Sequence, residues 1–248
     1  MIHRKYGWVP DLPDKRDRYH APRDVMPSTL PRKVDLSPVM PPCWDQLDLG
    51  SCTAFAIGGA LAYEHALREE HFTPSFLQLY YAERELEGAV QIDGGAYIRD
   101  GAKVAAQQGM APSSLWPYQP SRFAVKPSKQ ARKAALDHRV TSYARVRQRS
   151  GDLRSTLAGG DTIVFGVTVY ESFEAPRNGI IPMPRPHEEL LGGHAILLVG
   201  YDDDSQLFKF RNSWGTSWGE HGYAYLPYEY VLDEDLAADF WVLKEVTP

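Results

Sequence analysis

The sequence predicts an α+β fold with two lobes, in which helices come first and strands second. Apolar residues spaced for buried helices occur between residues 52 and 109. Four segments rich in β-branched and aromatic residues, separated by Gly and Asp, follow residue 160. Runs of helices followed by runs of strands are typical of α+β proteins, and a cleft between two lobes is a common place for a site.

Three helices are expected in the first half of the chain. The first runs from Cys52 to about Glu70, where many small residues indicate a buried helix with close neighbours. The second begins at Thr73-Pro74, a capping residue followed by proline in the first turn, and continues through SFLQLYYAEREL. The third lies in AYIRDGAKVAAQQG, and we expect it to end at Gly109.

Four strands are expected in the second half, and two of them form a hairpin. The segment YDDDSQLF indicates two strands joined by a tight polar turn. We interpret Asp202–Asp204 as a solvated turn rather than a calcium site, because further oxygen ligands are not apparent. The expected strands are TIVFGVTVY (162–170), HAILLVGYD (194–202), LFKFRN (207–212) and GYAYL (222–226).

The composition argues against several classes of protein. The net charge of −5 gives no reason to expect nucleic acid or an anionic membrane surface as a partner. Two cysteines make no disulfide framework and favour a reducing compartment. Without a signal peptide or a run of ~20 apolar residues, we expect a cytoplasmic monomer that does not span a membrane. The sequence has neither zinc-binding spacing nor a glycine-rich phosphate loop, so no metal ion or cofactor is expected.

Residues 1–30 are expected to form an extended arm, because their prolines prevent regular helix and central strand. Such an arm is ordered only if it docks on the body, and Tyr6, Trp8 and Tyr19 are candidate anchors. Two interpretations stay open. The arm is either a short prosegment that lies across the cleft or an extension that is packed permanently on the body.

Cys52 is a candidate nucleophile because it begins a helix, where the helix dipole favours thiolate. A cysteine nucleophile also needs a positioned base and donors for the oxyanion. His194 begins an apolar strand and could be that base, with Asn212 orienting its imidazole without charge. The side chain of Gln46 and the backbone N–H of Cys52 could be the donors. Trp214 could shield the bond between His194 and Asn212 from water.

The segments that hold these residues resemble motifs of the papain-like cysteine peptidases. QLDLGSCTAFA resembles the family's segment with glutamine six residues before the nucleophile, and GGHAILLVGYD resembles its histidine strand. FRNSWGTSWGEHGY resembles its asparagine–serine–tryptophan block, which is the longest match. The glycine pair in IDGGAYIRDGAKVAAQQG resembles the pair whose backbone binds substrate peptide. His194 lies 142 residues after Cys52, within the roughly 130–150 expected for the family.

The resemblance implies a papain-like two-lobe fold for residues 31–248. A mainly helical lobe over 31–138 would face an antiparallel, β-barrel-like lobe over 139–248, with the active site in the cleft between them. It also implies a cysteine endopeptidase that acts on peptide or protein substrates through an acyl-enzyme, and that is autoinhibited if residues 1–30 lie across the cleft. One wall of the pocket for the second substrate residue before the cleaved bond, the S2 pocket, is expected near Leu236–Phe240.

The resemblance also implies a role for each site residue. Cys52 would be the nucleophile, and His194 would act first as base and then as acid. Asn212 would orient His194, and Gln46 would donate to the oxyanion. The implied substrate-binding residues are Gly94, Gly95, Gly193 and Trp214, and Gly95 is the expected partner for the substrate backbone.

Three residues depart from the family pattern. Thr53 stands where most relatives have tryptophan, and Leu49 stands where many have a disulfide cysteine. The loss of that disulfide agrees with an intracellular or bacterial-type member. Gly193 stands where many relatives carry Asn or Asp, which leaves the shape of the S2 and primed-side surfaces open.

Several alternatives remain at this point. The same triad could transfer the acyl group to an amine, as in an acyltransferase, transpeptidase or amidase, or the chain could be a non-catalytic relative that binds peptides. The basic stretch 122–154 is either a solvated surface that links the lobes or a docking patch for an anionic ligand. Cys43 is either a small packing residue or a redox partner of Cys52.

Overall fold

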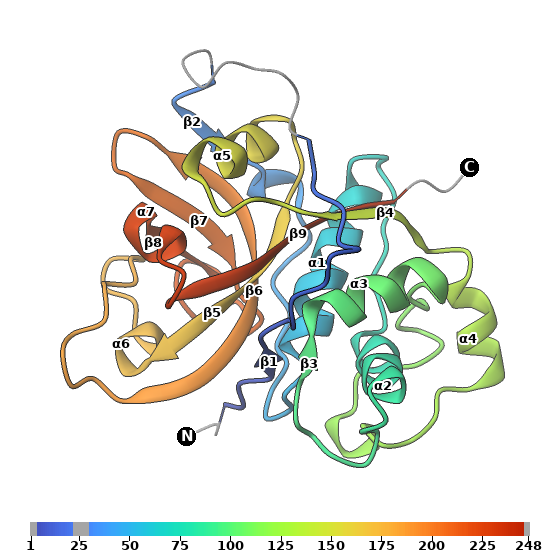
Figure 1. Ribbon diagram of the computed structural model, residues 1–248. Coiled ribbons are helices and arrows are strands. Elements are labelled where there is room, and N and C mark those ends of the chain that lie inside the picture. The colour runs from blue at the N-terminus through green and yellow to red at the C-terminus, as the bar shows by residue number, and fades with distance from the viewer. Residues whose placement is uncertain (1–3, 22–29, 246–248) are drawn as a thin grey trace.

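A computed structural model describes residues 4–21 and 30–245 of the chain. The longer helices gather on one side and a sheet forms the other side, so the chain is α+β as predicted (Figure 1). The helical side contains α1 (Cys52–Ala66), α2 (Phe76–Leu86), α3 (Ile98–Gln107) and α4 (Lys129–Ala135). The sheet side carries α5 (Ser150–Ala158), α6 (Glu171–Glu174) and α7 (Tyr228–Leu232). The described residues also form two short 3₁₀ helices, η2 (Ser37–Val39) and η3 (Pro120–Arg122).

The second predicted helix begins later than expected. α2 starts at Phe76, because Ser75 caps it: the Ser75 hydroxyl accepts a hydrogen bond of 3.3 Å from the backbone N–H of Gln78. Pro74 was expected in the first helical turn. It lies instead in an isolated β-bridge with Pro112, so the prediction of a helix start at Thr73-Pro74 was wrong.

The first and third predicted helices form with small differences at their ends. α1 ends at Ala66 rather than near Glu70, and almost every residue along it is buried, as its small side chains indicate. α3 ends at Gln107, and Gly109 stops it in a left-handed conformation with φ of 72°. The backbone N–H of Gly109 donates to the carbonyl of Val104 at 3.2 Å, which satisfies a carbonyl at the helix end.

The described residues form a seven-stranded sheet whose strands follow the order β4-β9-β5-β6-β7-β8, with β2 paired to β6. Its pairings are antiparallel, as predicted. The order does not return to its first strand, so the described part of the sheet stays open instead of closing into a barrel. The strands are β2 (Lys33–Asp35), β4 (Val140–Arg145), β5 (Ile163–Tyr170), β6 (Leu190–Asp202), β7 (Leu207–Arg211), β8 (Tyr223–Pro227) and β9 (Ala237–Glu245).

The four predicted strands correspond to β5, β6, β7 and β8. β6 begins at Leu190, four residues before its predicted start at His194. The predicted hairpin between β6 and β7 is confirmed, with Asp202 opposite Leu207. The strands β4 and β9 were not predicted; β9 pairs with β4 on one side and with β5 on the other, across long stretches of sequence.

Residues 4–21 are the described part of the predicted extension, and they run in an extended conformation between the two sides (Figure 1). We call this segment the arm. Its strand β1 (Trp8–Val9) pairs in parallel with β3 (Ala96–Tyr97). Of the candidate anchors, the Trp8 side chain is buried, whereas Tyr19 is 56% exposed and contacts the body through a β-bridge with Arg145 and through Arg147, which lies 5.1 Å from the centroid of its ring. Residues 1–3 and 22–29 lie outside the described residues.

Membrane insertion by a helix finds no support in this structure. Within residues 4–21 and 30–245, none of the helices has the length and apolar character needed to cross a bilayer.

We predict that Gly109→Ala destabilises the protein more than Gly88→Ala. Both glycines have nearly the same positive φ, of 72° and 71°, so alanine at either position costs about 1 kcal/mol in backbone strain. A Cβ at Gly109 would also lie 1.8 Å from the carbonyl oxygen of Ala135, whereas a Cβ at Gly88 meets nothing within 4 Å. The clash should add roughly 1–3 kcal/mol. Equal free energies of unfolding in urea would contradict this account.

Candidate active site

Packing of α1 against β6 brings Cys52 next to the strand that carries His194. Cys52 is the first residue of α1, and its side chain is fully buried. The backbone N–H groups of Ala195, in β6, and of Thr53 interact with the Cys52 thiol. Cys52 therefore lies between the N–H groups at the start of α1 and the backbone N–H of Ala195 in β6. These donors favour negative charge on the sulfur.

His194 is held by Asn212 and covered by Trp214. The Nε2 atom of His194 lies 2.8 Å from Oδ1 of Asn212, just after the end of β7. The same Oδ1 accepts a 2.8 Å hydrogen bond from the backbone N–H of Ser213, so it is an acceptor and Nε2 carries the hydrogen. The Trp214 ring stacks on the imidazole with a centroid distance of 4.8 Å. This arrangement leaves Nδ1 as the ring atom that can take up a proton.

Gln46 is buried and its amide is oriented by neighbours on both sides. Its Oε1 accepts a 2.6 Å hydrogen bond from the hydroxyl of Ser213, and its Nε2 donates to the carbonyl of Leu49 at 2.9 Å. Nε2 also donates to the carbonyl of Lys5, in the arm, at 3.2 Å. The donor that was predicted to stabilise an oxyanion thus holds a carbonyl of the arm.

The arm passes through the site at Gly7, where only glycine fits. The Gly7 carbonyl accepts a 2.8 Å hydrogen bond from the backbone N–H of Ala96, and the Gly7 backbone N–H interacts with the Cys52 thiol. A Cβ at Gly7 would lie 1.9 Å from the carbonyl oxygen of Gly50. A Cβ at Gly95 would lie 2.0 Å from the Gly7 carbonyl oxygen. Two glycines, Gly7 and Gly95, therefore allow the arm to lie directly against the wall of the site.

The other predicted substrate-binding residues differ in their contact with the arm. A Cβ at Gly193 would lie 2.6 Å from the Trp8 carbonyl oxygen, and the guanidinium of Arg4 lies 4.1 Å from the centroid of Trp214. Gly94 does not face the arm, because a Cβ there would meet only Ile92. Gly95, Gly193 and Trp214 thus gather around the arm, and Gly94 does not.

Burial keeps both members of the candidate catalytic pair neutral. Burial raises the pKa of Cys52 to about 11, and hydrogen bonds from Ala195 and Gly7 offset this only in part. Burial also lowers the pKa of His194 to about 4, against the opposing effect of its bond to Asn212. At neutral pH this burial therefore disfavours the thiolate–imidazolium pair that an activated cysteine requires.

Asp93 is a contact residue that the sequence reasoning missed. Its carboxylate accepts hydrogen bonds from Tyr80 Oη at 2.6 Å, from the backbone N–H of Gly50 at 3.0 Å and from Lys5 Nζ at 2.7 Å. The only signal for Asp93 in the sequence was its position directly before Gly94 and Gly95. Asp93 thereby ties the wall of the site to the arm.

Thr53 takes the place of the tryptophan seen in most relatives, and it contacts a buried acid. Its hydroxyl donates a 2.9 Å hydrogen bond to Oε2 of Glu83 in α2. Burial raises the pKa of Glu83 well above its usual range, which favours the protonated form of this carboxyl group. A buried, hydrogen-bonded pair of polar groups therefore supports the helix turn behind Cys52.

Cys43 and Cys52 are both buried and are not bonded to each other. Cys43 packs against Gly222, whose hypothetical Cβ would lie 2.4 Å from the Cys43 sulfur, and it also contacts Tyr223. These contacts agree with a packing role for Cys43.

Three arginines of the basic stretch 122–154 each interact with a different set of partners. Arg145 pairs with three aspartates, Arg154 pairs with Asp203 at 2.7 Å, and Arg122 stacks on Trp116 at 4.0 Å. An anionic ligand at this stretch stays a prediction. Among the residues that the structure describes, no cluster of three or more His, Cys, Asp or Glu side chains could hold a metal ion.

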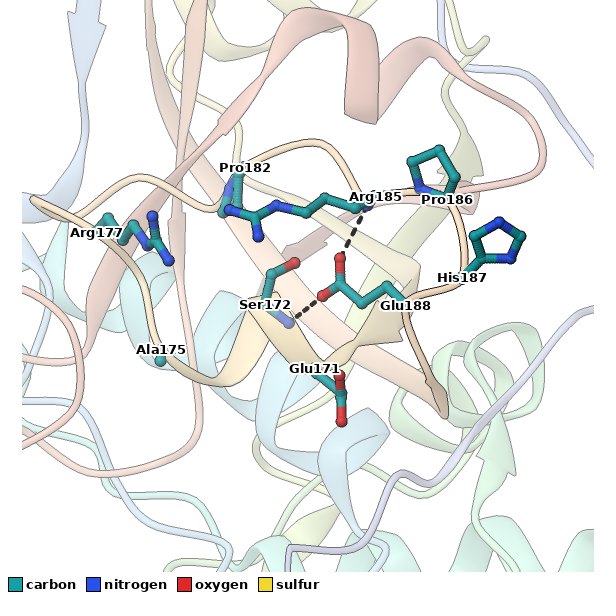
Figure 2. A pocket seen from close by; sticks show the side chains of 9 residues that line it. All are labelled: Glu171, Ser172, Ala175, Arg177, Pro182, Arg185, Pro186, His187 and Glu188. Atoms are coloured by element: carbon teal, nitrogen blue, oxygen red, sulfur yellow. Dashed lines mark hydrogen bonds between the residues drawn. The ribbon is translucent and has the colours of Figure 1, made fainter.

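A separate hollow lies in the segment between β5 and β6. Figure 2 shows the Glu188 carboxylate directed at the backbone of Ser172 and of Arg185, and it accepts a hydrogen bond from the N–H of each. The hollow is lined mainly by charged and polar residues, including Glu171 and Arg177. None of the residues predicted as catalytic lines it, so it is distinct from the candidate active site.

Comparison with known proteins gave consistent matches. The family described as "Papain family cysteine protease" matches residues 30–232. The chain is 36% identical to an uncharacterized peptidase C1-like protein of Acanthamoeba polyphaga mimivirus, with 99% of this chain and 88% of that protein covered. The structure of xylellain, a cysteine protease from Xylella fastidiosa, superposes with a TM-score of 0.94 at 41% identity, covering 99% and 97% of the two chains. Digestive procathepsin L 3 of Tenebrio molitor, at 18% identity and a TM-score of 0.76 over 98% and 77% of the chains, shares the fold.

We predict that Gly7→Ala, in the full-length chain, exposes Cys52 to alkylation. The added Cβ would collide with the Gly50 carbonyl, so the arm cannot dock there. If the thiol pKa then falls from about 11 to its ordinary 9.0, the thiolate fraction at pH 7 rises about 100-fold. Labelling of Cys52 by iodoacetamide, followed by peptide mass spectrometry, should accelerate to the same extent.

The matched control for this prediction is Lys15→Ala. Lys15 is exposed in the same arm, so its loss should leave the labelling rate of Cys52 as it is in the unmodified protein. Equal labelling of Cys52 in the Gly7→Ala variant and in the unmodified protein would show that the arm does not protect the thiol.

Proposed function

Because the chain belongs to the papain family of cysteine proteases and is a cysteine-type peptidase with the papain-like fold, we propose that it cleaves peptide bonds through Cys52, His194 and Asn212. The observation that carries the proposal is the 2.8 Å contact between His194 Nε2 and Asn212 Oδ1. It fixes the imidazole so that Nδ1 is available to the thiol proton. Peptides and proteins are the substrates that the family implies.

The proposed reaction proceeds in two steps. His194 Nδ1 takes the proton of the Cys52 thiol, and the thiolate attacks the carbonyl carbon of the scissile bond. Gln46 Nε2 and the backbone N–H of Cys52 stabilise the resulting oxyanion, and His194 then gives its proton to the departing amine. Water, deprotonated by His194, attacks the thioester and releases the acid. An amine could attack the same thioester, and product analysis with added amines tests that alternative.

We further propose that the arm is an inhibitor of this site. The Lys5 carbonyl occupies the Gln46 donor that the oxyanion would need, and the Gly7 N–H faces the thiol. The arm therefore presents a hydrogen-bond donor to the thiol where the proposed reaction needs a carbonyl carbon. The ion pair of Lys5 with Asp93 and the hydrogen bond of Tyr6 with Glu174 hold the arm at this point.

The nucleophile is tested by replacing each of the two cysteines in turn in the Gly7→Ala chain, whose arm is predicted not to dock. In the Gly7→Ala chain, Cys52→Ala should lower kcat/KM on a peptide substrate by a factor of roughly 10⁴ or more, because no other group can form the thioester. Cys43→Ala should keep kcat/KM within about threefold, since Cys43 packs against Gly222 and Tyr223 and is not one of the proposed catalytic residues. Peptidase activity that survives Cys52→Ala would refute the proposed mechanism.

Inhibition by the arm is tested in trans. A synthetic peptide of residues 4–21 should inhibit the Gly7→Ala chain in competition with substrate, because it can make the contacts that the variant arm cannot. The same peptide with Ala in place of Gly7 should inhibit far more weakly, because its Cβ meets the Gly50 carbonyl. Equal inhibition by both peptides would mean that the fit at Gly7 does not control access to the site.

A further inference from the structure

The hydroxyl of Tyr118 joins two points of the loop that leads into Cys52. Tyr118 lies in the segment between α3 and η3, far from this loop in the sequence. Its Oη donates a 2.7 Å hydrogen bond to the backbone carbonyl of Gln46. It also lies 2.8 Å from Oγ of Ser51, the residue directly before Cys52. One side chain therefore holds both ends of the loop 46–51.

The direction of these two hydrogen bonds follows from the number of hydrogens. A tyrosine hydroxyl has a single hydrogen, and the Gln46 carbonyl can only accept one. The hydrogen of Tyr118 therefore goes to Gln46, and Ser51 donates to Tyr118. Ser51 directly precedes α1, but its hydroxyl makes no capping bond to that helix. Burial raises the pKa of Tyr118 above its ordinary value, which keeps its hydroxyl protonated.

Aromatic packing against α1 fixes where this hydroxyl lies. The Tyr118 ring meets the ring of Phe55 edge to face, with a centroid distance of 5.0 Å and an interplanar angle of 89°. Phe55 in turn stacks on Phe76, the first residue of α2, at a centroid distance of 4.0 Å. Phe55 lies three residues after Cys52 in α1. The Tyr118 ring is therefore placed relative to the same helix that carries the proposed nucleophile.

The two ends of the loop carry the two proposed oxyanion donors. One donor is Nε2 of Gln46, and the other is the backbone N–H of Cys52, which directly follows Ser51. Both donors act together only when each lies about 2.7–3.1 Å from the position of the oxyanion, so the shape of the loop decides whether they do. That shape includes Leu47 in a left-handed conformation with φ of 56°. Residues with side chains rarely adopt it, so contacts from outside the loop must hold it.

Ser213 anchors one end of this loop. Its backbone carbonyl accepts a 2.9 Å hydrogen bond from the backbone N–H of Gln46, and its hydroxyl donates to Gln46 Oε1 at 2.6 Å. Both contacts act at Gln46. Tyr118 connects this anchored end to Ser51, at the end that leads into α1.

We propose that Tyr118 is a positioning residue of the peptidase reaction, and that its hydroxyl sets the distance between the Gln46 and Cys52 oxyanion donors. The proposal rests on the proposed function and deepens it. Tyr118 acts through these two donors, so its contribution appears only when an oxyanion forms. Removal of the hydroxyl therefore weakens the binding of the transition state and leaves the binding of the substrate unchanged.

The test compares Tyr118→Phe with Tyr63→Phe, both in the full-length Gly7→Ala chain. Each substitution keeps the ring and removes a hydroxyl that donates to a backbone carbonyl, which for Tyr63 is that of Gly160 at 3.0 Å. Tyr118→Phe should lower kcat and kcat/KM on a peptide substrate by about tenfold each and leave KM within about twofold. Tyr63→Phe should change neither parameter by more than about twofold. An unchanged kcat in the Tyr118→Phe variant would overturn the proposal.

A second measurement separates the placement of the donors from a general loosening of the site. Iodoacetamide reacts with the Cys52 thiolate at a saturated carbon: a bond between sulfur and carbon forms, iodide leaves, and no oxyanion is made. Tyr118→Phe should therefore leave the labelling rate of Cys52 within about twofold of that in the Gly7→Ala chain. A labelling rate that falls as far as kcat would contradict the proposal, because the hydroxyl would then support the nucleophile.

A double-mutant cycle tests whether Tyr118 acts through Gln46. Gln46→Ala alone should lower kcat by roughly 10²–10³, the effect of losing one oxyanion donor. Adding Tyr118→Phe to Gln46→Ala should lower kcat by no more than about threefold further, because one of the two donors that it positions is already gone. A further decrease of the full tenfold would mean that the two residues act independently, and the proposal would be wrong.

The outcomes also distinguish this proposal from the proposed function beneath it. If the Gly7→Ala chain cleaves no peptide in a Cys52-dependent manner, the peptidase function itself fails, and the role of Tyr118 in that reaction fails with it. If cleavage depends on Cys52 but Tyr118→Phe behaves like Tyr63→Phe, only the role of Tyr118 is overturned.

Discussion

Close packing of α1 against β6 is the contact on which the rest of the site depends. α1 carries Cys52, and β6 carries His194. Small side chains along α1 allow the approach: a Cβ at Gly59 would lie only 3.4 Å from Leu197 of β6. The helical and sheet sides therefore meet where Cys52 and His194, the proposed nucleophile and base, lie. Every other part of the site, from Gln46 to Trp214, is arranged around this junction.

The arm lies at the same junction of α1 and β6, where we propose that it inhibits the reaction. It adds a short parallel strand to β3 and places backbone groups at the thiol and at Gln46. The pKa values of Cys52 and His194, which are both buried beneath the docked arm and the body, are shifted in opposite directions, and this stabilises the neutral pair. Steric exclusion and electrostatics thus act together, since the arm both fills the cleft and disfavours the charged state of the groups beneath it.

The sequence was informative where local chemistry decides structure. The α+β class, the three helices and the four central strands could be predicted because periodicity and turn residues are local signals. Cys52, His194, Asn212 and Gln46 could be singled out because each lies in a distinctive segment, although their catalytic roles remain proposals. The contacts of Asp93 and Tyr118 and the pairing of β4 with β9 could not be predicted, because they arise from residues far apart in sequence. The start of α2 was misplaced because the side chain of Ser75, rather than Pro74, satisfies the helix end.

The arm is part of the same polypeptide as the cleft that it covers, and this has a kinetic consequence. A tethered segment returns to its site by a unimolecular step, so dilution of the protein does not relieve its occupancy of the cleft. Under the proposed inhibition, substrate competes for the cleft only while the arm is undocked, so the observed rate would reflect the fraction of molecules that are open. Permanent release requires a covalent event, such as a cut in the chain, that makes the return of the arm a bimolecular encounter.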